Sequence, residues 1–232
     1  MRRDPAVVLD VHHFDGPRER LLALWAQIAP HYAGADPGVS FELLNELHDP
    51  TTAEEWNALL AEALAVVRET NPRRTVIAGP VRWNIVDALP GLRLPDDEHL
   101  VATVHYHSPF RFTHQGAGWI DGAAAWLGTS WGSDAERARV RADLQRAAAW
   151  ARAQGRRCSW ASPGPSAPAA MDARARWTEQ VRSEAERLGM SWAYRDFATD
   201  FGALDPGRNA WRAQYAHSSA GPRRGRGLLG AR

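Results

Sequence analysis

Val39-Ser-Phe-Glu-Leu-Leu-Asn-Glu46 is the stretch from which the architecture of this chain can be worked out. It is mostly apolar, and turn residues bound it on both sides, Pro37-Gly38 before it and His48-Asp49-Pro50 after it. This pattern predicts a short buried strand that ends on a carboxylate. In barrel folds the carboxyl ends of the strands carry the chemistry, so Glu46 is a candidate catalytic residue. For an isolated strand, a solvated glutamate would be the better interpretation.

Strand-like and helix-like segments alternate along the whole chain. Apolar runs predict strands at residues 6–12, 39–46, 75–79, 100–107, 158–162 and 191–197. Helical spacing predicts helices at 17–32, 52–70, 133–155 and 171–188, with a short one at 83–89. A repeat of strand and helix implies parallel strands with helices packed outside them, in an open sheet or in a barrel.

Local signals mark several of these boundaries. Thr52 with Glu55, and Ser133 with Glu136, have the spacing of capping boxes that open helices. Gly155 is placed to end the second of these helices. The strand expected near Cys158 is a poor one, because prolines follow it closely at 163, 165 and 168. The connection at 108–132 is long and aromatic, which suggests a functional loop.

Composition limits the classes of function. The 232 residues are 44% hydrophobic and 24% charged, which suits one large globular domain. A net charge of +1 gives no electrostatic case for nucleic acid or an anionic membrane. The single cysteine, Cys158, excludes an intramolecular disulfide framework and a cysteine-based zinc site. We find no signal peptide after Met1 and no apolar run of the roughly twenty residues that span a bilayer. Localisation stays open.

In the barrel interpretation, the strand ends gather polar residues on one rim. No glycine-rich phosphate loop follows any strand, which argues against nucleotide binding. We expect this rim to carry His12, Asn45, Glu46, His105 and Ser162.

Several motifs together carry a family resemblance. They are Leu9-Asp-Val-His-His13, Phe41-Glu-Leu-Leu-Asn-Glu46, His105-Tyr106, Phe110-Arg-Phe-Thr-His-Gln-Gly116 and Met190-Ser-Trp-Ala-Tyr194. Over about residues 6 to 211 the chain resembles glycoside hydrolase family five, the retaining, cellulase-like group of eight-stranded barrels. The resemblance implies an α/β fold, an incomplete (β/α)8 TIM barrel that covers about barrel strands three to eight. It also implies hydrolysis of O-glycosyl bonds in β-glucans, a polysaccharide or oligosaccharide substrate, and no cofactor.

The resemblance also implies roles for individual residues. Glu46 would be the general acid/base, and Asn45 would hold the 2-hydroxyl of the sugar. A retaining enzyme needs a second carboxylate as nucleophile, about 5 Å from the first. The resemblance, together with the ability of aromatic rings to stack on sugars, implies the substrate-binding set His12, Asn45, His105, Tyr106, His107, Trp83 and Arg195.

The chain departs from the family pattern at the nucleophile. Counting from Gly155-Arg156, the position of the glutamate falls on Ser162, and residues 156–171 contain no acidic residue. Three further positions differ: His107 replaces a tyrosine, Arg195 a tryptophan and Leu47 a proline. The first two strand-helix units of the family are also absent, together with the arginine carried by the second. We expect hydrolysis by this chain to be impaired or lost.

The stretch Arg157–Ala169 has a composition of its own. The family pattern matches in register on both sides of it, while the stretch itself turns to Ser, Pro, Gly and Ala. A pair of compensating frame shifts would keep the length and change the residues in this way. Translation of the nucleotides in the other two frames tests the hypothesis, which requires an apolar strand ending in Gly-Glu.

Two other functions remain open at this point. A non-catalytic carbohydrate-binding remnant or gene fragment could still stack sugar rings on Trp83, Tyr106 and Trp119. A metal-dependent barrel hydrolase is a further alternative, because histidines and one aspartate cluster at two strand ends: Asp10, His12, His13, His105 and His107. No carboxylate from the last strands clearly completes such a site.

The domain prediction is a partial barrel over residues 1–215 and a basic, disordered tail over 216–232. Strands near Ala6 and Ser191 would present unpaired edges in an incomplete barrel. Because unpaired edges invite pairing with another chain, we expect self-association.

Overall fold

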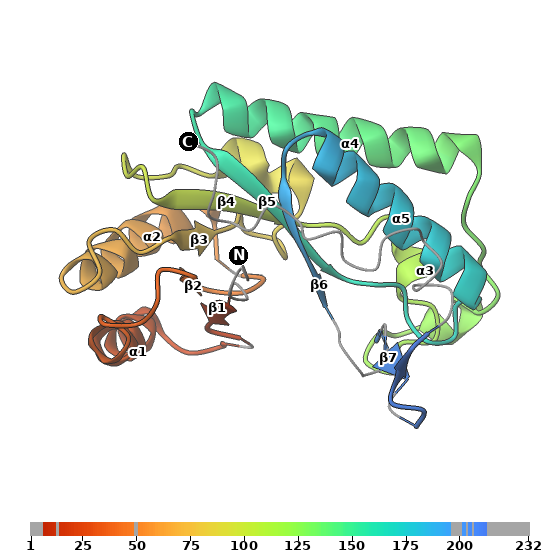
Figure 1. Cartoon of the computed structure of the whole chain (residues 1–232), viewed down its shortest axis with the longest axis horizontal. Coiled ribbons are helices and arrows are strands. Elements are labelled where there is room, and N and C mark those ends of the chain that lie inside the picture. Colours follow the sequence, from red (N-terminus) through yellow and green to blue (C-terminus); the bar gives the residue numbers. More distant parts are fainter. Residues whose placement is uncertain are drawn as a thin grey trace. The chain divides into compact units, whose positions relative to one another are not determined.

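A computed structural model describes residues 7–12, 14–48, 51–195, 201–202, 204–205 and 207–212 (Figure 1). Six strands form one sheet in the order β1-β2-β3-β4-β5-β6, and β7 and β8 form a separate antiparallel pair. Their bounds are β1 Val7–Asp10, β2 Val39–Glu42, β3 Val76–Ala78, β4 Leu100–His105, β5 Arg157–Pro163, β6 Ser191–Arg195, β7 Leu204–Asp205 and β8 Ala210–Trp211. The first four strands pair in parallel, as the strand-helix repeat predicts.

Helices separate the strands of the large sheet. They are α1 Arg18–His31, α2 Ala53–Arg68, α3 Phe110–Thr113, α4 Asp134–Ala153 and α5 Met171–Arg187, with 3-10 helices η1 Val86–Gly91 and η2 Ala123–Trp126. The long connection at 108–132 therefore contains α3 and η2. The predicted α/β alternation is confirmed.

Both predicted capping boxes form. The Thr52 amide donates to the Glu55 carboxylate at 2.8 Å, and the Glu55 amide donates to Thr52 Oγ1 at 3.2 Å. Ser133 and Glu136 make the same two bonds at 2.8 and 3.3 Å. Gly155 has a φ of 62°, so the predicted glycine does follow α4 in the left-handed conformation that suits a helix end.

Two strands end earlier than their apolar runs. β2 stops at Glu42, so Asn45 and Glu46 lie in the following loop. The φ of Glu46 is 47°, a left-handed value that a strand cannot accommodate. β4 stops at His105, and the carbonyl of His107 accepts a bond from Thr113 Oγ1 at 2.7 Å. β5 forms over seven residues in spite of the prolines, and Pro163 is its last residue, where a missing amide matters least.

The chain divides into two compact units. Among the described residues, the first unit holds 7–105 and 149–159, and the second holds 106–148 and 160–212. The Glu46 loop and His105 both belong to the first unit, whereas His107 and Ser162 belong to the second.

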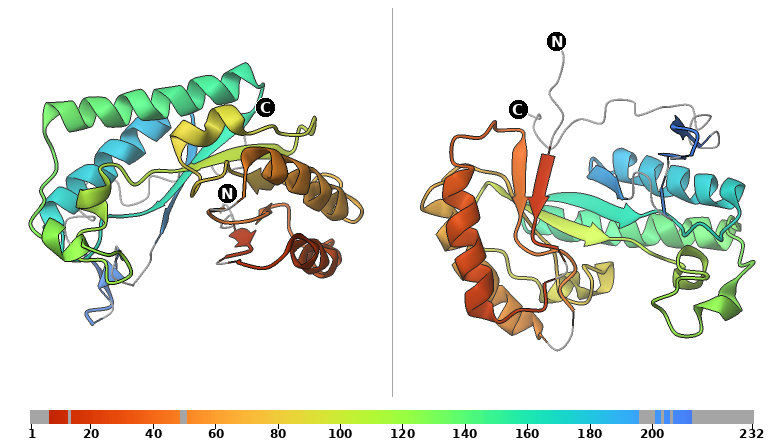
Figure 2. Two further views of the ribbon diagram at one scale, coloured as in Figure 1. Left: turned by 180° about the vertical axis from the view of Figure 1, so that it is seen from behind. Right: turned by 90° about the horizontal axis from the view of Figure 1, so that it is seen from below.

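Tryptophans fasten the helices of the first unit to its strands. Trp25 of α1 donates through Nε1 to Leu43 O at 2.9 Å, and Trp56 of α2 donates to Gly79 O at 2.8 Å. Both indoles are buried, and Trp25 packs on Phe41 with ring centroids 5.2 Å apart. The two helices lie side by side in both views of Figure 2. Each indole bond therefore fixes the backbone just beyond a strand end.

Arg74 holds the main chain at the opposite ends of the strands, where the connection from α1 enters β2. Its guanidinium donates to the carbonyls of Tyr32, Ala35, Asp36 and Val39 at 2.9, 3.0, 2.6 and 3.0 Å. The side chain is buried over the ring of Phe41. Burial lowers the pKa of Arg74, but the carbonyl bonds satisfy the charged group. The connection from α1 to β2 is held by its main chain.

The second unit has an aromatic core of its own. Trp177 of α5 donates to Ser108 O at 2.9 Å, and its ring lies 6.5 Å from that of Trp160. Trp160 and Trp131 are also buried, so core filling accounts for many of the eleven tryptophans.

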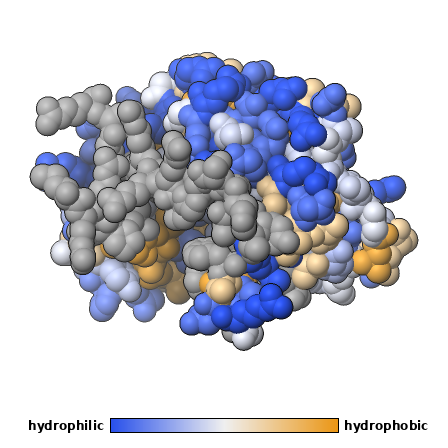
Figure 3. Space-filling model, turned by 45° about the vertical axis from the view of Figure 1, so that its right-hand side comes forward, coloured by the Kyte–Doolittle hydropathy of each residue, from blue (hydrophilic) through white to orange (hydrophobic). Residues whose placement is uncertain are grey.

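Hydrophilic residues predominate on the face of the molecule drawn in Figure 3, and hydrophobic ones form small separate patches. Among the described residues, the large apolar side chains that stay exposed are Val7, Val8, Trp83, Phe110, Trp119 and Leu127. None of the helices in the described part of the chain combines the length and the apolar character that crossing a bilayer requires.

Candidate active site

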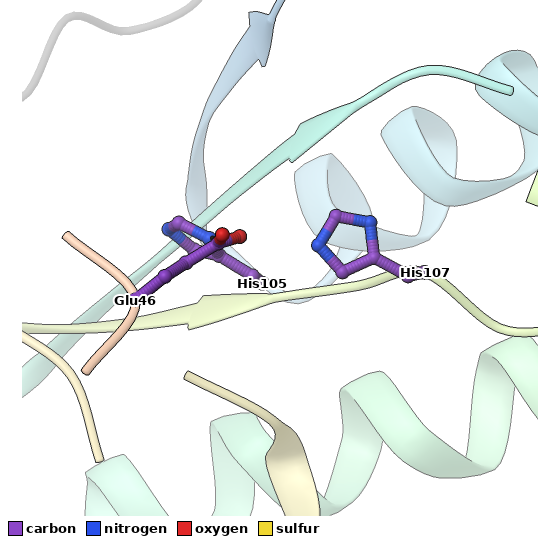
Figure 4. Close-up of side chains that lie close together, drawn as sticks. All are labelled: Glu46, His105 and His107. Carbon is purple, nitrogen blue, oxygen red and sulfur yellow. Dashed lines mark hydrogen bonds and ion pairs between the residues drawn. The ribbon is translucent and has the colours of Figure 1, made fainter. Parts of the chain in front are cut away.

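The centre of the site is a contact between Glu46 and His105. Glu46 Oε1 lies 2.6 Å from His105 Nδ1, and Figure 4 shows the two side chains directed toward each other. Glu46 comes from the loop after β2, and His105 is the last residue of β4. The His105 side chain is 5% exposed and that of Glu46 is 22% exposed. The carboxylate therefore reaches solvent while the imidazole that holds it stays buried.

Asn84 lies behind His105. Its Nδ2 is 3.4 Å from His105 Nε2, and its carbonyl accepts the His105 amide at 2.8 Å. The Asn84 side chain is buried. Sequence reasoning missed this residue because it belongs to no motif and lies outside every predicted strand end.

The segment that carries Asn84 has an unusual backbone. Arg82, Trp83 and Asn84 have φ values of 61°, 56° and 56°. A left-handed conformation costs about 1–2 kcal/mol per ordinary residue, although asparagine adopts it readily. The Trp83 amide donates to Leu47 O at 2.9 Å, so the segment is attached to the residue after Glu46. Strained conformations of this kind persist where surrounding structure holds them, often at functional sites.

His12, two residues after β1, has contacts similar to those of His105. Its Nδ1 lies 2.6 Å from Asp10 Oδ2, and its Nε2 lies 3.5 Å from the amide nitrogen of Asn45. Both ring nitrogens of each histidine are thus occupied by a carboxylate and an asparagine amide. The rim expected from the sequence is therefore present within the first unit for His12, Asn45, Glu46 and His105. A metal would have to displace one of these contacts, and His13 lies outside the described residues.

Glu42 is a buried carboxyl that the sequence did not single out. Burial raises its pKa to about 8, with further contributions from the charges of Asp10 and Glu46. Its Oε1 has no hydrogen-bond partner among the described residues. Glu42 therefore keeps its proton at pH 7, close to the charged groups of Asp10 and Glu46.

Trp83 forms an exposed platform beside the Glu46 loop. Its ring is stacked on His48 with centroids 5.6 Å apart and an interplanar angle of 8°. His48 Nδ1 donates to Glu46 O at 3.1 Å. Trp83 is 46% exposed, so one indole face is open to a ligand.

Tyr106 does not fit the stacking role expected from the sequence. It is buried, its hydroxyl donates to Asp143 Oδ2 at 3.1 Å, and its ring lies on Trp177 at 6.2 Å. Burial and the Asp143 charge raise the pKa of Tyr106 above its ordinary value. The side chain is part of the core because β4 and the residue after it are buried on both faces.

The remaining predicted residues belong to the second unit. His107 lies two residues beyond β4 and is also drawn in Figure 4; its ring meets that of His114 edge-on at 5.2 Å. Ser162 lies on β5 and Arg195 ends β6, and the side chains of both are outside the described set. Trp119 is exposed, and its ring centroid lies 5.9 Å from that of Phe201.

Comparison with known proteins identifies the family of this chain. The family model for cellulase, glycosyl hydrolase family 5, matches residues 1–197. The chain belongs to this family. Endoglucanase H of Acetivibrio thermocellus is 31% identical to it over 140 residues, which are 57% of this chain and 14% of that protein. Endoglucanase C of the same organism is 32% identical over 136 residues, which are 52% of this chain and 39% of the relative.

Solved structures of the family share the fold. Endoglucanase Cel5A from the hyperthermophilic Thermotoga maritima superposes with a TM-score of 0.88 at 36% identity, covering 92% of this chain and 72% of that one. Cellulose synthase subunit Z from Clostridioides difficile gives a TM-score of 0.88 at 31% identity, with 92% and 73% covered. The fold of this family 5 chain is an incomplete (β/α)8 TIM barrel. The matched residues span less than half the length of endoglucanases H and C.

Proposed function

We propose that this family 5 chain binds β-glucan chains, with Glu46 as the general acid/base of a retaining glycosidase whose turnover is impaired. The observation that carries the proposal is the 2.6 Å contact between Glu46, in the loop after β2, and His105, at the end of β4. The proposal is also supported by Asn45, which is adjacent to Glu46 and would hold the 2-hydroxyl of the sugar. Solved relatives include Thermotoga maritima Cel5A in complex with cellobiose, a β-glucan fragment.

In a retaining mechanism, one carboxyl group protonates the leaving oxygen while a second carboxylate attacks the anomeric carbon. Glu46 can fill the first role, and later deprotonate the water that releases the sugar. Ser162 stands at the second position, and a serine hydroxyl is a weak nucleophile unless a base activates it. Loss of the covalent nucleophile commonly lowers turnover by orders of magnitude, while sugar binding depends on other contacts.

Restoring the carboxylate tests the proposal. We expect Ser162→Glu to gain hydrolysis of a chromogenic cello-oligosaccharide, with retention of anomeric configuration in the NMR spectrum of the first product. Ser162→Gln has the same shape without the charge and is the matched control, which should stay inactive. Adding Glu46→Gln to Ser162→Glu should abolish the gained activity. Hydrolysis by the double variant at the same rate would contradict the role of Glu46.

A non-catalytic glucan-binding protein is the second candidate, favoured by the exposed Trp83 platform together with Ser162. Calorimetry with a soluble cello-oligosaccharide and a turnover assay on the same sample distinguish the two. Binding without turnover, in the natural chain and in Ser162→Glu, would establish the binding function alone.

A further inference from the structure

We propose that Asn84 is a positioning residue for the acid/base: it fixes the tautomer of His105 and thereby places the exchangeable proton of Glu46 on Oε2. The inference rests on the proposed role of Glu46. It follows from three contacts within the first unit, those of Asn84 with His105, of His105 with Glu46, and of Gly79 with Asn84.

The first step is the direction of the hydrogen bonds. An amide nitrogen can only donate, so the Asn84 Nδ2 that faces His105 Nε2 at 3.4 Å makes that ring nitrogen an acceptor. A neutral imidazole carries one proton, which must then be on Nδ1. Nδ1 points at Glu46 Oε1 at 2.6 Å and donates to it. An ionised Glu46 carboxylate also only accepts and favours the same tautomer, so Asn84 is decisive when Glu46 is protonated and could otherwise donate to Nδ1.

The second step is that Asn84 has no freedom to turn away. It is 1% exposed, and a Cβ on Gly79 would lie 2.4 Å from Asn84 Cγ. Only a glycine leaves room for the amide there. The main chain on both sides is also fixed, because Trp83 N–H bonds to Leu47 O and Asn84 O accepts the His105 amide. The backbone of Trp83 and Asn84 is thus hydrogen-bonded both to the loop of Glu46 and to the end of β4.

The third step concerns the proton of Glu46. Oε1 accepts the Nδ1–H of His105, so a proton on Oε1 would face another hydrogen across 2.6 Å. Protonation therefore takes place on Oε2. A general acid must present its proton in a defined direction toward the leaving oxygen, and this arrangement supplies that direction before substrate binds.

Nitrogen-15 NMR of the histidine-labelled full chain tests the inference. At about pH 8 an ordinary imidazole is neutral, and its two nitrogen shifts identify the protonated one. The signals of His105 are those missing from the spectrum of His105→Gln. We expect Nδ1 to carry the proton in the natural chain. In Asn84→Asp, which keeps the size and tolerates the left-handed backbone, the carboxylate accepts a hydrogen bond and Nε2 becomes protonated.

Two further variants sharpen the test. Asn57 also bonds through its side chain, to Gly91 O at 2.9 Å and from the Arg93 amide, but does not contact a histidine. Asn57→Asp is therefore the matched control and should leave the His105 shifts unchanged. Gly79→Ala reaches Asn84 by another route: its methyl group displaces the amide, so the population of the Nδ1–H tautomer of His105 should fall.

A natural chain with the proton on Nε2 would overturn the inference without any variant. So would a folded Asn84→Asp, judged by circular dichroism, in which Nε2 stays unprotonated. Neither result depends on turnover. Failure of Ser162→Glu to hydrolyse glucan bears on the proposed function alone, and the spectra decide the role of Asn84.

Discussion

Asp10 of β1 and Glu42 of β2 are direct partners in the parallel register, so two carboxyl groups occupy neighbouring positions on adjacent strands. The two are not equivalent. Asp10 pairs with His12 at 2.6 Å, whereas Glu42 is buried and has a pKa of about 8. The sheet accommodates the pair because Glu42 keeps its proton.

The raised pKa of Glu42 makes stability depend on pH. Between its ordinary value of 4.5 and about 8, the folded chain holds a proton that the unfolded chain has lost. The free energy of unfolding therefore falls as pH rises through this window, by at most about 5 kcal/mol. Glu42→Gln should remove most of this pH dependence of the free energy of unfolding and should be more stable than the natural chain at pH 8. Urea melts at pH 5 and pH 8 measure both effects. Glu69→Gln, at an exposed position, should show the same pH dependence of unfolding as the natural chain. If Glu42→Gln also showed that pH dependence, the raised pKa of Glu42 would be contradicted.

The capping box of α2 predicts a local contribution to stability. Thr52→Ala removes the side-chain acceptor for the Glu55 amide and should cost about 1 kcal/mol in chemical unfolding. Thr51→Ala, one residue earlier and outside the capping box, should change stability little. Equal losses in the two variants would show that the effect comes from helix propensity or solvation rather than from the cap.

We expect the exposed face of Trp83 to stack on a sugar ring and so to contribute part of the affinity for glucan. Trp83→Ala should weaken binding of a soluble cello-oligosaccharide about tenfold, corresponding to roughly 1.4 kcal/mol of stacking. Trp83→Phe keeps an aromatic face and should retain most of the affinity. Calorimetry measures both, and unchanged affinity in Trp83→Ala would exclude this platform from the binding site.

The outer position of β1 in the strand order predicts self-association. Val7 is 48% exposed on this strand, and an exposed apolar edge invites pairing with another chain. We expect oligomers in size-exclusion chromatography with light scattering, reduced by Val7→Lys. Leu127→Lys changes an exposed apolar residue outside any strand and serves as control. A monodisperse monomer of the natural chain would contradict the prediction.

Most of the architecture could be predicted because it depends on local patterns. Apolar runs identify all six strands of the large sheet, and two capping boxes identify helix starts, since both signals are contained in a few consecutive residues. The two-residue strands β7 and β8 are too short to leave such a pattern. Glu46 and His105 could be named from strand ends, but their contact joins residues 59 positions apart.

Other features could not be read from the sequence because they depend on tertiary packing. Trp83 and Tyr106 are both aromatic residues close to strand ends, yet one is exposed and the other is enclosed by Asp143 and Trp177. Asn84 matters through its left-handed backbone and its close approach to Gly79, which no spacing rule indicates. Glu42 resembles any strand glutamate until its burial is known.

The four carbonyl bonds of Arg74 have a consequence for how this family member can diverge. The bonds that this guanidinium donates to the connection from α1 and to the first residue of β2 all end on main-chain oxygens, which every amino acid possesses. Side chains along this connection can therefore change over evolutionary time without loss of the attachment, provided that the length and path of its backbone are kept. An insertion there should be far more harmful than a substitution.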